Sequence, residues 1–182
     1  MSRLSRASYE IQNTILIMVG LLLIPIYPAP VLAGQNDGFS QYEIFDWVSK
    51  ELEIEGQYPI PEIRLVSKKI LQVVLLNESG KGFERLIGLY GGTDPERRRR
   101  HYLSNILGLF LPETGVAYVR KDLTPCRRNS IIAHEYTHYF QNRQFGRTSY
   151  LKPHEQEEVH IFREQEAREI ENQFFQQFCN TK

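Results

Sequence analysis

The chain has 182 residues, no net formal charge, and a composition that is 41% hydrophobic and 12% aromatic. This length and composition allow one sizeable buried core, so we expect a single folded domain. The balanced charge gives no global attraction to nucleic acid or to a membrane, and no nucleic-acid partner is expected.

The N-terminal segment differs in kind from the rest of the chain. Two arginines precede an apolar run at 15–24, and a small-residue pattern follows that ends at Ala33. These are the parts of a secretory signal, so we predict a signal peptide cleaved after Ala33 and an exported, periplasmic or secreted domain at 34–182. An uncleaved membrane anchor at 11–32 is the alternative.

Four elements are predicted between this segment and the middle of the chain. Apolar residues at helical intervals predict a helix over 39–52. Alternation predicts a strand at 62–66, and a helix over 67–76 follows it. Asp94 and Pro95 are a helix start, which predicts a helix ending at Gly108. Its four consecutive arginines are interpreted as a solvated charged face.

A hairpin and a long helix follow. Residues 109–121 predict a β-hairpin whose second strand is Val116–Arg120. Thr124 and Pro125 then provide an N-cap and a first helical residue, and Gly146 provides a stop. The apolar residues between them predict a packed helix of about 20 residues.

This helix contains His134-Glu135-Tyr136-Thr137-His138. Residues four apart lie on one helix face, with Cβ atoms about 5–6 Å apart, so both imidazoles can face one metal ion. Two histidines supply half of the tetrahedral ligand set of zinc and leave places for a third side chain and a water. Glu135 lies about 100° further around the helix, where its carboxylate reaches the water.

The His-Glu-x-x-His stretch resembles the zincin metallopeptidases, and more narrowly the gluzincin branch, whose third ligand is a Glu on a later helix. The resemblance covers roughly residues 60–178, and only this stretch is specific. The metzincin branch is excluded, because Gln141 and Gln144 replace its Gly and His. The resemblance implies a small α+β, zincin-like domain, mainly helical, with a small sheet beside the motif helix. It also implies that Val116–Arg120 is the strand that edges the cleft and pairs with an extended substrate.

The third ligand is expected on a long charged helix at 155–178. In gluzincins the ligand Glu often has a small residue three positions later, and Glu164 meets this condition with Ala167. Glu166 is the alternative. The Asp that many gluzincins carry four residues after the ligand is Arg168 here, which leaves the support of the histidines undefined. Two histidines are further candidates: His154, just before this helix, and His160 within it.

These residues predict a zinc-dependent peptidase. Zinc bound by His134, His138 and Glu164 would activate a water, with Glu135 as general base. A protein or peptide is the expected substrate, and the expected activity is that of an endopeptidase. The alternative is a catalytically inactive zinc-bound protein-interaction module at the membrane surface.

Several features stay open at this stage. Zincins usually add a Tyr or His donor for the developing oxyanion, and Tyr150 and His160 are both candidates. Export would favour a bridge between Cys126 and Cys179, but two buried free thiols fit equally well. Contact with a membrane surface and the oligomeric state are not decided.

Overall fold

The computed structural model describes residues 38–78, 94–146 and 152–179. They belong to a compact unit that spans residues 35–182. The predicted signal peptide or anchor lies outside the described residues. No helix among those described combines the length and apolarity needed to cross a membrane.

The described part of the chain is a mainly helical α+β unit with a small sheet, which confirms the predicted fold class. The helices are α1 (Gln41–Glu51), α2 (Lys68–Glu78), α4 (Pro95–Asn105), α5 (Pro125–Phe145) and α6 (Pro153–Cys179). The strands are β1 (Glu62–Val66), β2 (Gly108–Leu111) and β3 (Val116–Arg120).

Local sequence signals account for several boundaries. At the start of α1, the Ser40 side chain accepts the Glu43 N–H while the Glu43 carboxylate accepts the Ser40 N–H, a reciprocal capping box. Asp94 caps α4 by accepting the Arg97 N–H. Pro125 occupies the first turn of α5, and Gly146 ends that helix with a φ of 67°.

The sheet has the strand order β1-β3-β2, with β1 parallel to β3 and β2 antiparallel to it. The prediction that Val116–Arg120 edges the cleft is therefore wrong, because β3 is the central strand. β1 pairs with it through Glu62↔Val116, and the hairpin places β2 on its other side through Leu111↔Val116. Among the described strands, β1 and β2 are the two edges of the sheet, and each pairs with β3.

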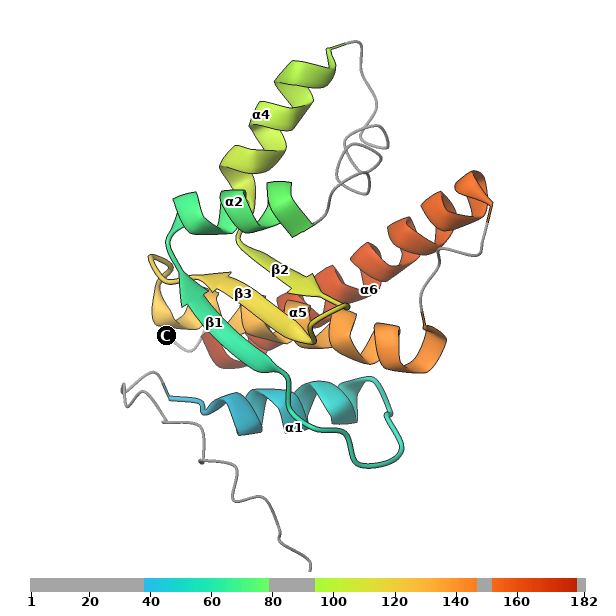
Figure 1. The fold of residues 1–182 in the computed structure, drawn as a ribbon. Helices are drawn as coiled ribbons and strands as arrows, with labels where there is room; N and C mark the ends of the chain where they lie inside the picture. Colours follow the sequence, from blue (N-terminus) through green and yellow to red (C-terminus); the bar gives the residue numbers. More distant parts are fainter. Residues whose placement is uncertain (1–37, 79–93, 147–151, 180–182) are drawn as a thin grey trace, which may run out of the picture. The chain divides into compact units, whose positions relative to one another are not determined.

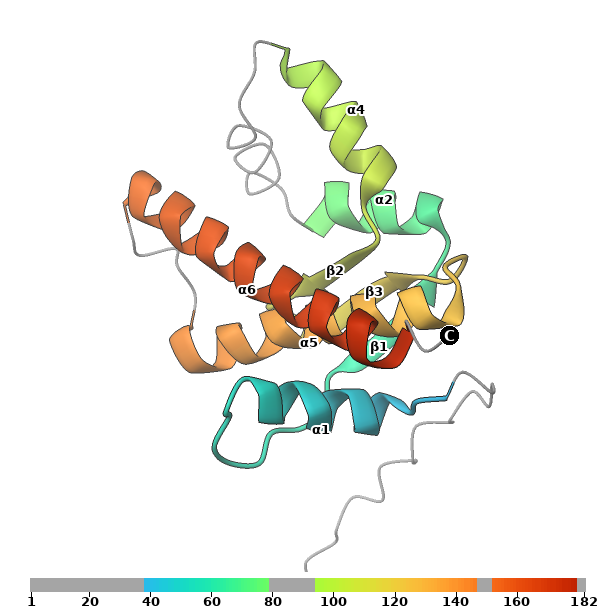
Figure 2. The same cartoon turned by 180° about the vertical axis from the view of Figure 1, so that it is seen from behind.

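Helices cover both faces of the sheet. α2 contacts β2 and β3 on one face of the sheet, and α5 contacts the same two strands from the other. α6 and α1 pack on α5, so that α5 lies between the sheet and α6 (Figures 1 and 2). The motif helix is thus the central helix of the fold.

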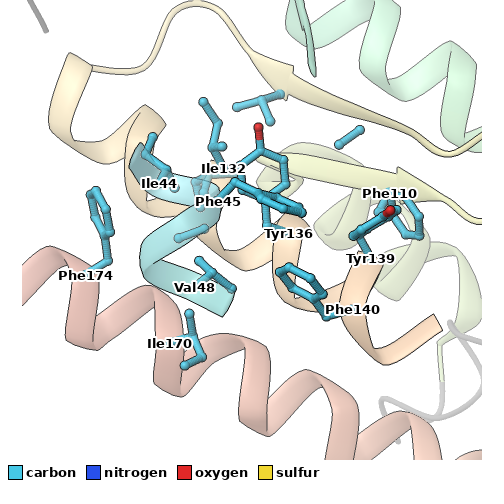
Figure 3. Close-up of a cluster of buried hydrophobic side chains, with 14 residues drawn as sticks. Ile44, Phe45, Val48, Phe110, Ile132, Tyr136, Tyr139, Phe140, Ile170 and Phe174 are labelled. Carbon is cyan, nitrogen blue, oxygen red and sulfur yellow. The ribbon is translucent and has the colours of Figure 1, made fainter. Parts of the chain in front are cut away.

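The main core surrounds α5 (Figure 3). Tyr136, Phe140 and Phe174 are at most 1% exposed, and Phe45 of α1 stacks against the first two at ring-centroid distances of 5.2 Å and 4.8 Å. A smaller cluster of Leu71, Leu75 and Ile106 lies on the α2 side of the sheet. Burial of this many aromatic side chains fixes the rotation of α5, and with it the direction of its polar residues.

A disulfide joins the two long helices. Cys126 in the first turn of α5 is bonded to Cys179, the last residue of α6, across a sequence separation of 53. Of the two alternatives left open by the sequence, the structure has the bridge. It ties the start of one helix to the end of the other, so the two helices are held antiparallel beside each other.

Candidate metal centre

The two motif histidines occupy the face of α5 that is turned toward α6. Their neighbours Ala133 and Thr137 are buried, whereas the His134 and His138 side chains are 14% and 20% exposed. They therefore lie at the border of the core, where a ligand can approach. The apolar residues of α5 fix this orientation.

The structure brings three potential ligands together. The Nε2 atoms of His134 and His138 lie 3.1 Å apart. Glu164 of α6 places Oε1 3.2 Å from the His138 Nε2 and Oε2 3.9 Å from the His134 Nε2. In a tetrahedral zinc site with bonds of about 2.0–2.1 Å, neighbouring ligand atoms lie about 3.3 Å apart. The donor set of two nitrogens and one carboxylate therefore has the size and chemistry that zinc requires, although the metal type is not identified.

The contact made by the Nδ1 of His138 shows which of its two ring nitrogens carries the free lone pair. Its Nδ1 lies 2.9 Å from Oε1 of Gln141, whose amide nitrogen already donates to the Arg163 carbonyl and to Glu166. Oε1 can only accept, so the proton of a neutral His138 is on Nδ1. The Nε2 lone pair then faces His134 and Glu164, as a metal ligand requires.

His134 is supported in a similar way by Glu171. The His134 Nδ1 lies in close contact with Glu171, 2.9 Å from its Oε2. Arg127 holds the other carboxylate oxygen at 2.6 Å from its Nη1. A carboxylate at this distance favours the proton on Nδ1 and leaves Nε2 free to bind a cation.

The sequence analysis assigned no role to Glu171 or Arg127. The only available signal was position, since Glu171 lies two helical turns after Glu164 and therefore on the same face of α6. Arg168, at the position of the Asp found in many gluzincins, is exposed. The carboxylate that contacts His134 is instead that of Glu171, three residues after Arg168.

The negative charge of Glu164 favours a positive charge between the ligand atoms of the cluster. Burial lowers the pKa of His138, but its hydrogen bond and charge interaction with Glu164 outweigh this and raise the pKa above its usual range. Burial raises the pKa of Glu164, but the contact with His138 reverses this shift and gives a net lowering. The cluster therefore attracts positive charge to the point between its ligand atoms.

Glu166, the alternative third ligand, is directed elsewhere. Its Oε2 accepts a hydrogen bond of 2.8 Å from the Gln141 amide, so it supports the residue that orients His138. Of the two histidines considered, His154 is exposed, and the metal-ligand cluster does not include His160. His160 is half-buried with its Nε2 shielded and unpartnered, and burial lowers its pKa. Tyr150 lies outside the described residues.

Glu135 is buried next to the cluster, with 4% of its surface exposed. Burial raises the pKa of its carboxyl, and the nearby His134 and His138 oppose this. Its Oε2 is shielded from solvent and has no hydrogen-bond partner. A buried carboxylate oxygen that lacks a partner is costly to maintain for structure alone, which favours a chemical role.

Comparison of the chain with protein-family models, with curated proteins and with solved structures gave no match. The resemblance to zincins therefore depends on residues 134–138 and on the geometry around them.

Proposed function

We propose that this protein is a zinc-dependent metallopeptidase that hydrolyses peptide bonds outside the cytoplasm. The observation that supports this most is the cluster of His134, His138 and Glu164, whose ligand atoms all lie within 4.8 Å of one another. A buried acid, Glu135, lies beside it. This combination suits hydrolysis better than a purely structural zinc site, which normally uses four protein ligands and needs no base.

A bound zinc ion would polarise the scissile carbonyl and lower the pKa of its bound water toward about 7. Glu135 accepts a proton from the attacking water and later donates it to the leaving amine. Its raised pKa makes the carboxylate a better proton acceptor at neutral pH than an exposed Glu. Glu171 and Gln141 keep the two imidazoles in the required orientation.

The substrate would be held by β2. This strand pairs with β3 on one side, and no described strand pairs with its other side. An extended peptide that adds to this edge would be fixed mainly by main-chain hydrogen bonds, which gives weak sequence preference. Because α5 contacts β2, such a peptide would lie close to the motif helix.

The first test is the zinc content of the purified chain beside the His138→Ala, Glu164→Ala and Glu166→Gln variants. We expect about one zinc per chain in the wild type and in Glu166→Gln, and loss of zinc in the other two. No zinc in the wild type after incubation with the metal would refute the proposal.

The second test separates an enzyme from the alternative, an inactive zinc-bound interaction module. Glu135→Gln keeps the shape of the side chain and removes the base, so zinc should stay bound while cleavage of a peptide library falls by about 10²–10⁴-fold. Equal activity in the two proteins, or none in a zinc-loaded wild type, would contradict peptidase function.

A further inference from the structure

Gly108, the first residue of β2, lies against the carboxyl of Glu135. A Cβ added at this position would lie 2.9 Å from Cδ of Glu135 and 2.8 Å from Cγ2 of Ile131, and would collide with Oε1 of Glu135. Real Cβ atoms essentially never come this close to other heavy atoms, so a side chain at 108 forces its neighbours to move.

The reason for glycine here is space and not backbone conformation. The φ of Gly108 is outside the left-handed region, and any residue adopts its backbone angles. The other four described glycines have positive φ values, and no added Cβ there would meet an atom closer than 3.8 Å. Among the described glycines, Gly108 is therefore the one whose missing side chain makes room for another residue.

The carboxyl of Glu135 has little freedom to avoid such a collision. It is buried, and Ile131 lies one turn earlier on the same side of α5 and is 4% exposed. Gly108 itself is held in the sheet by its register with Val119, which is fully buried. The core thus fixes both Ile131 and Gly108, so a methyl group added at 108 must displace the carboxyl of Glu135.

We propose that Gly108 is a positioning residue for Glu135. The space that the missing side chain leaves at the Gly108 Cα fixes where the Glu135 carboxylate lies. It also couples the start of β2 to the base. The catalytic part of this inference rests on the proposed function, whereas the steric part does not. The two parts are tested by different measurements.

The steric part is tested by thermal unfolding of four proteins: wild type, Gly108→Ala, Glu135→Ala and the double variant. Gly108→Ala should lower the Tm by roughly 3–10 °C, the usual effect of one extra carbon in a packed interior. In the Glu135→Ala background the collision with the carboxyl is gone and only the close contact with Ile131 remains, so the loss should be at most half as large. An equal loss in both backgrounds would overturn the inference, and this result does not depend on any activity.

The catalytic part is tested on zinc-loaded enzyme. Gly108→Ala should keep the zinc content and KM within about threefold while kcat falls by about tenfold or more, because positioned general bases contribute about 10²–10⁴-fold. The double variant Gly108→Ala/Glu135→Asp should be no slower than Glu135→Asp alone, since both changes misplace the same carboxylate. Losses of kcat that multiply, or a rise in KM alone, would show that Gly108 does not act through Glu135. A zinc-loaded wild type without activity would refute the proposed function and with it the catalytic part, and leave the unfolding result standing.

Discussion

The two halves of α6 differ in how they contact the rest of the protein. From Ala167 onward the helix is anchored: Ala167, Ile170 and Phe174 are buried, and the helix ends in the disulfide. Before Ala167 it is loosely covered, with Ile161 46% and Phe162 58% exposed. Glu164 lies three residues before the anchored half begins. Glu164, the proposed ligand, thus lies where the packing ends and is followed by the packed residues of the anchored half.

The same division separates Glu171 from the proposed ligand Glu164. Glu171, which contacts His134, belongs to the anchored half and is 8% exposed. Glu164, which approaches both histidines, belongs to the looser half. The anchored half therefore carries the buried packing and the contact with His134, and the looser half carries the proposed ligand and Glu166, which contacts Gln141. Each expectation below changes one half and leaves the other intact.

The largest effect should come from truncating a buried aromatic residue of the anchored half. Phe174→Ala should lower the free energy of unfolding by about 3–5 kcal/mol, because it leaves a cavity beside Phe39 and Trp47. Phe162→Ala in the looser half, as the matched control, should change it by at most about 0.5 kcal/mol. Urea unfolding monitored by circular dichroism measures both, and similar losses in the two variants would contradict the division.

Removal of the disulfide should have the next largest effect. Cys126→Ser/Cys179→Ser should cost about 2–4 kcal/mol of unfolding free energy, since the bridge closes a long loop in the unfolded chain. Unfolding of this variant beside the oxidised wild type gives the value. A midpoint that does not change would show that the bridge adds nothing to the packing of α6 on α5.

Glu171→Gln should weaken zinc binding by about 10–100-fold, because a neutral amide holds the His134 Nδ1 proton less strongly than a carboxylate does. Competition with a chromophoric chelator at fixed pH measures the affinity. The control is Glu169→Gln, an exposed acid two residues away that should leave the affinity unchanged. If both variants bind zinc as the wild type does, Glu171 has no part in orienting the ligand.

The smallest effect is expected for Glu166→Gln in the looser half. The new amide oxygen still accepts from Gln141, so zinc affinity should stay within about twofold of the wild type. Glu164→Gln, measured in the same chelator competition, removes a ligand and should lose affinity by far more. The opposite ranking of these two acids would assign the third ligand to Glu166.

Local signals in the sequence predicted most of the elements correctly. Asp94 with Pro95, and Pro125 with Gly146, mark ends of α4 and α5 through backbone chemistry that needs no tertiary contact. The helical period of apolar residues predicted α1. The His-Glu-x-x-His spacing also fixes the relation of its own residues, because they share one helix.

Features that depend on how elements pack could not be predicted. The order of the strands depends on the parallel pairing of β1 with β3, and no residue of the hairpin predicts that pairing. The contact of Arg127 with Glu171, and the choice between Glu164 and Glu166, depend on the rotation of α6 against α5. The sequence predicted Gly108 as the end of a helix, whereas its contact with Glu135 forms only when β2 packs on α5.

The disulfide divides the chain into a segment inside the loop that it closes and a segment outside it. It closes a covalent ring from Cys126 to Cys179 that contains the proposed ligands, the proposed base and the residues that orient the histidines. The edge strand and Gly108 lie outside this ring. Under the proposed function, substitutions in β2 therefore change the surface offered to a peptide while every proposed metal ligand stays inside the ring.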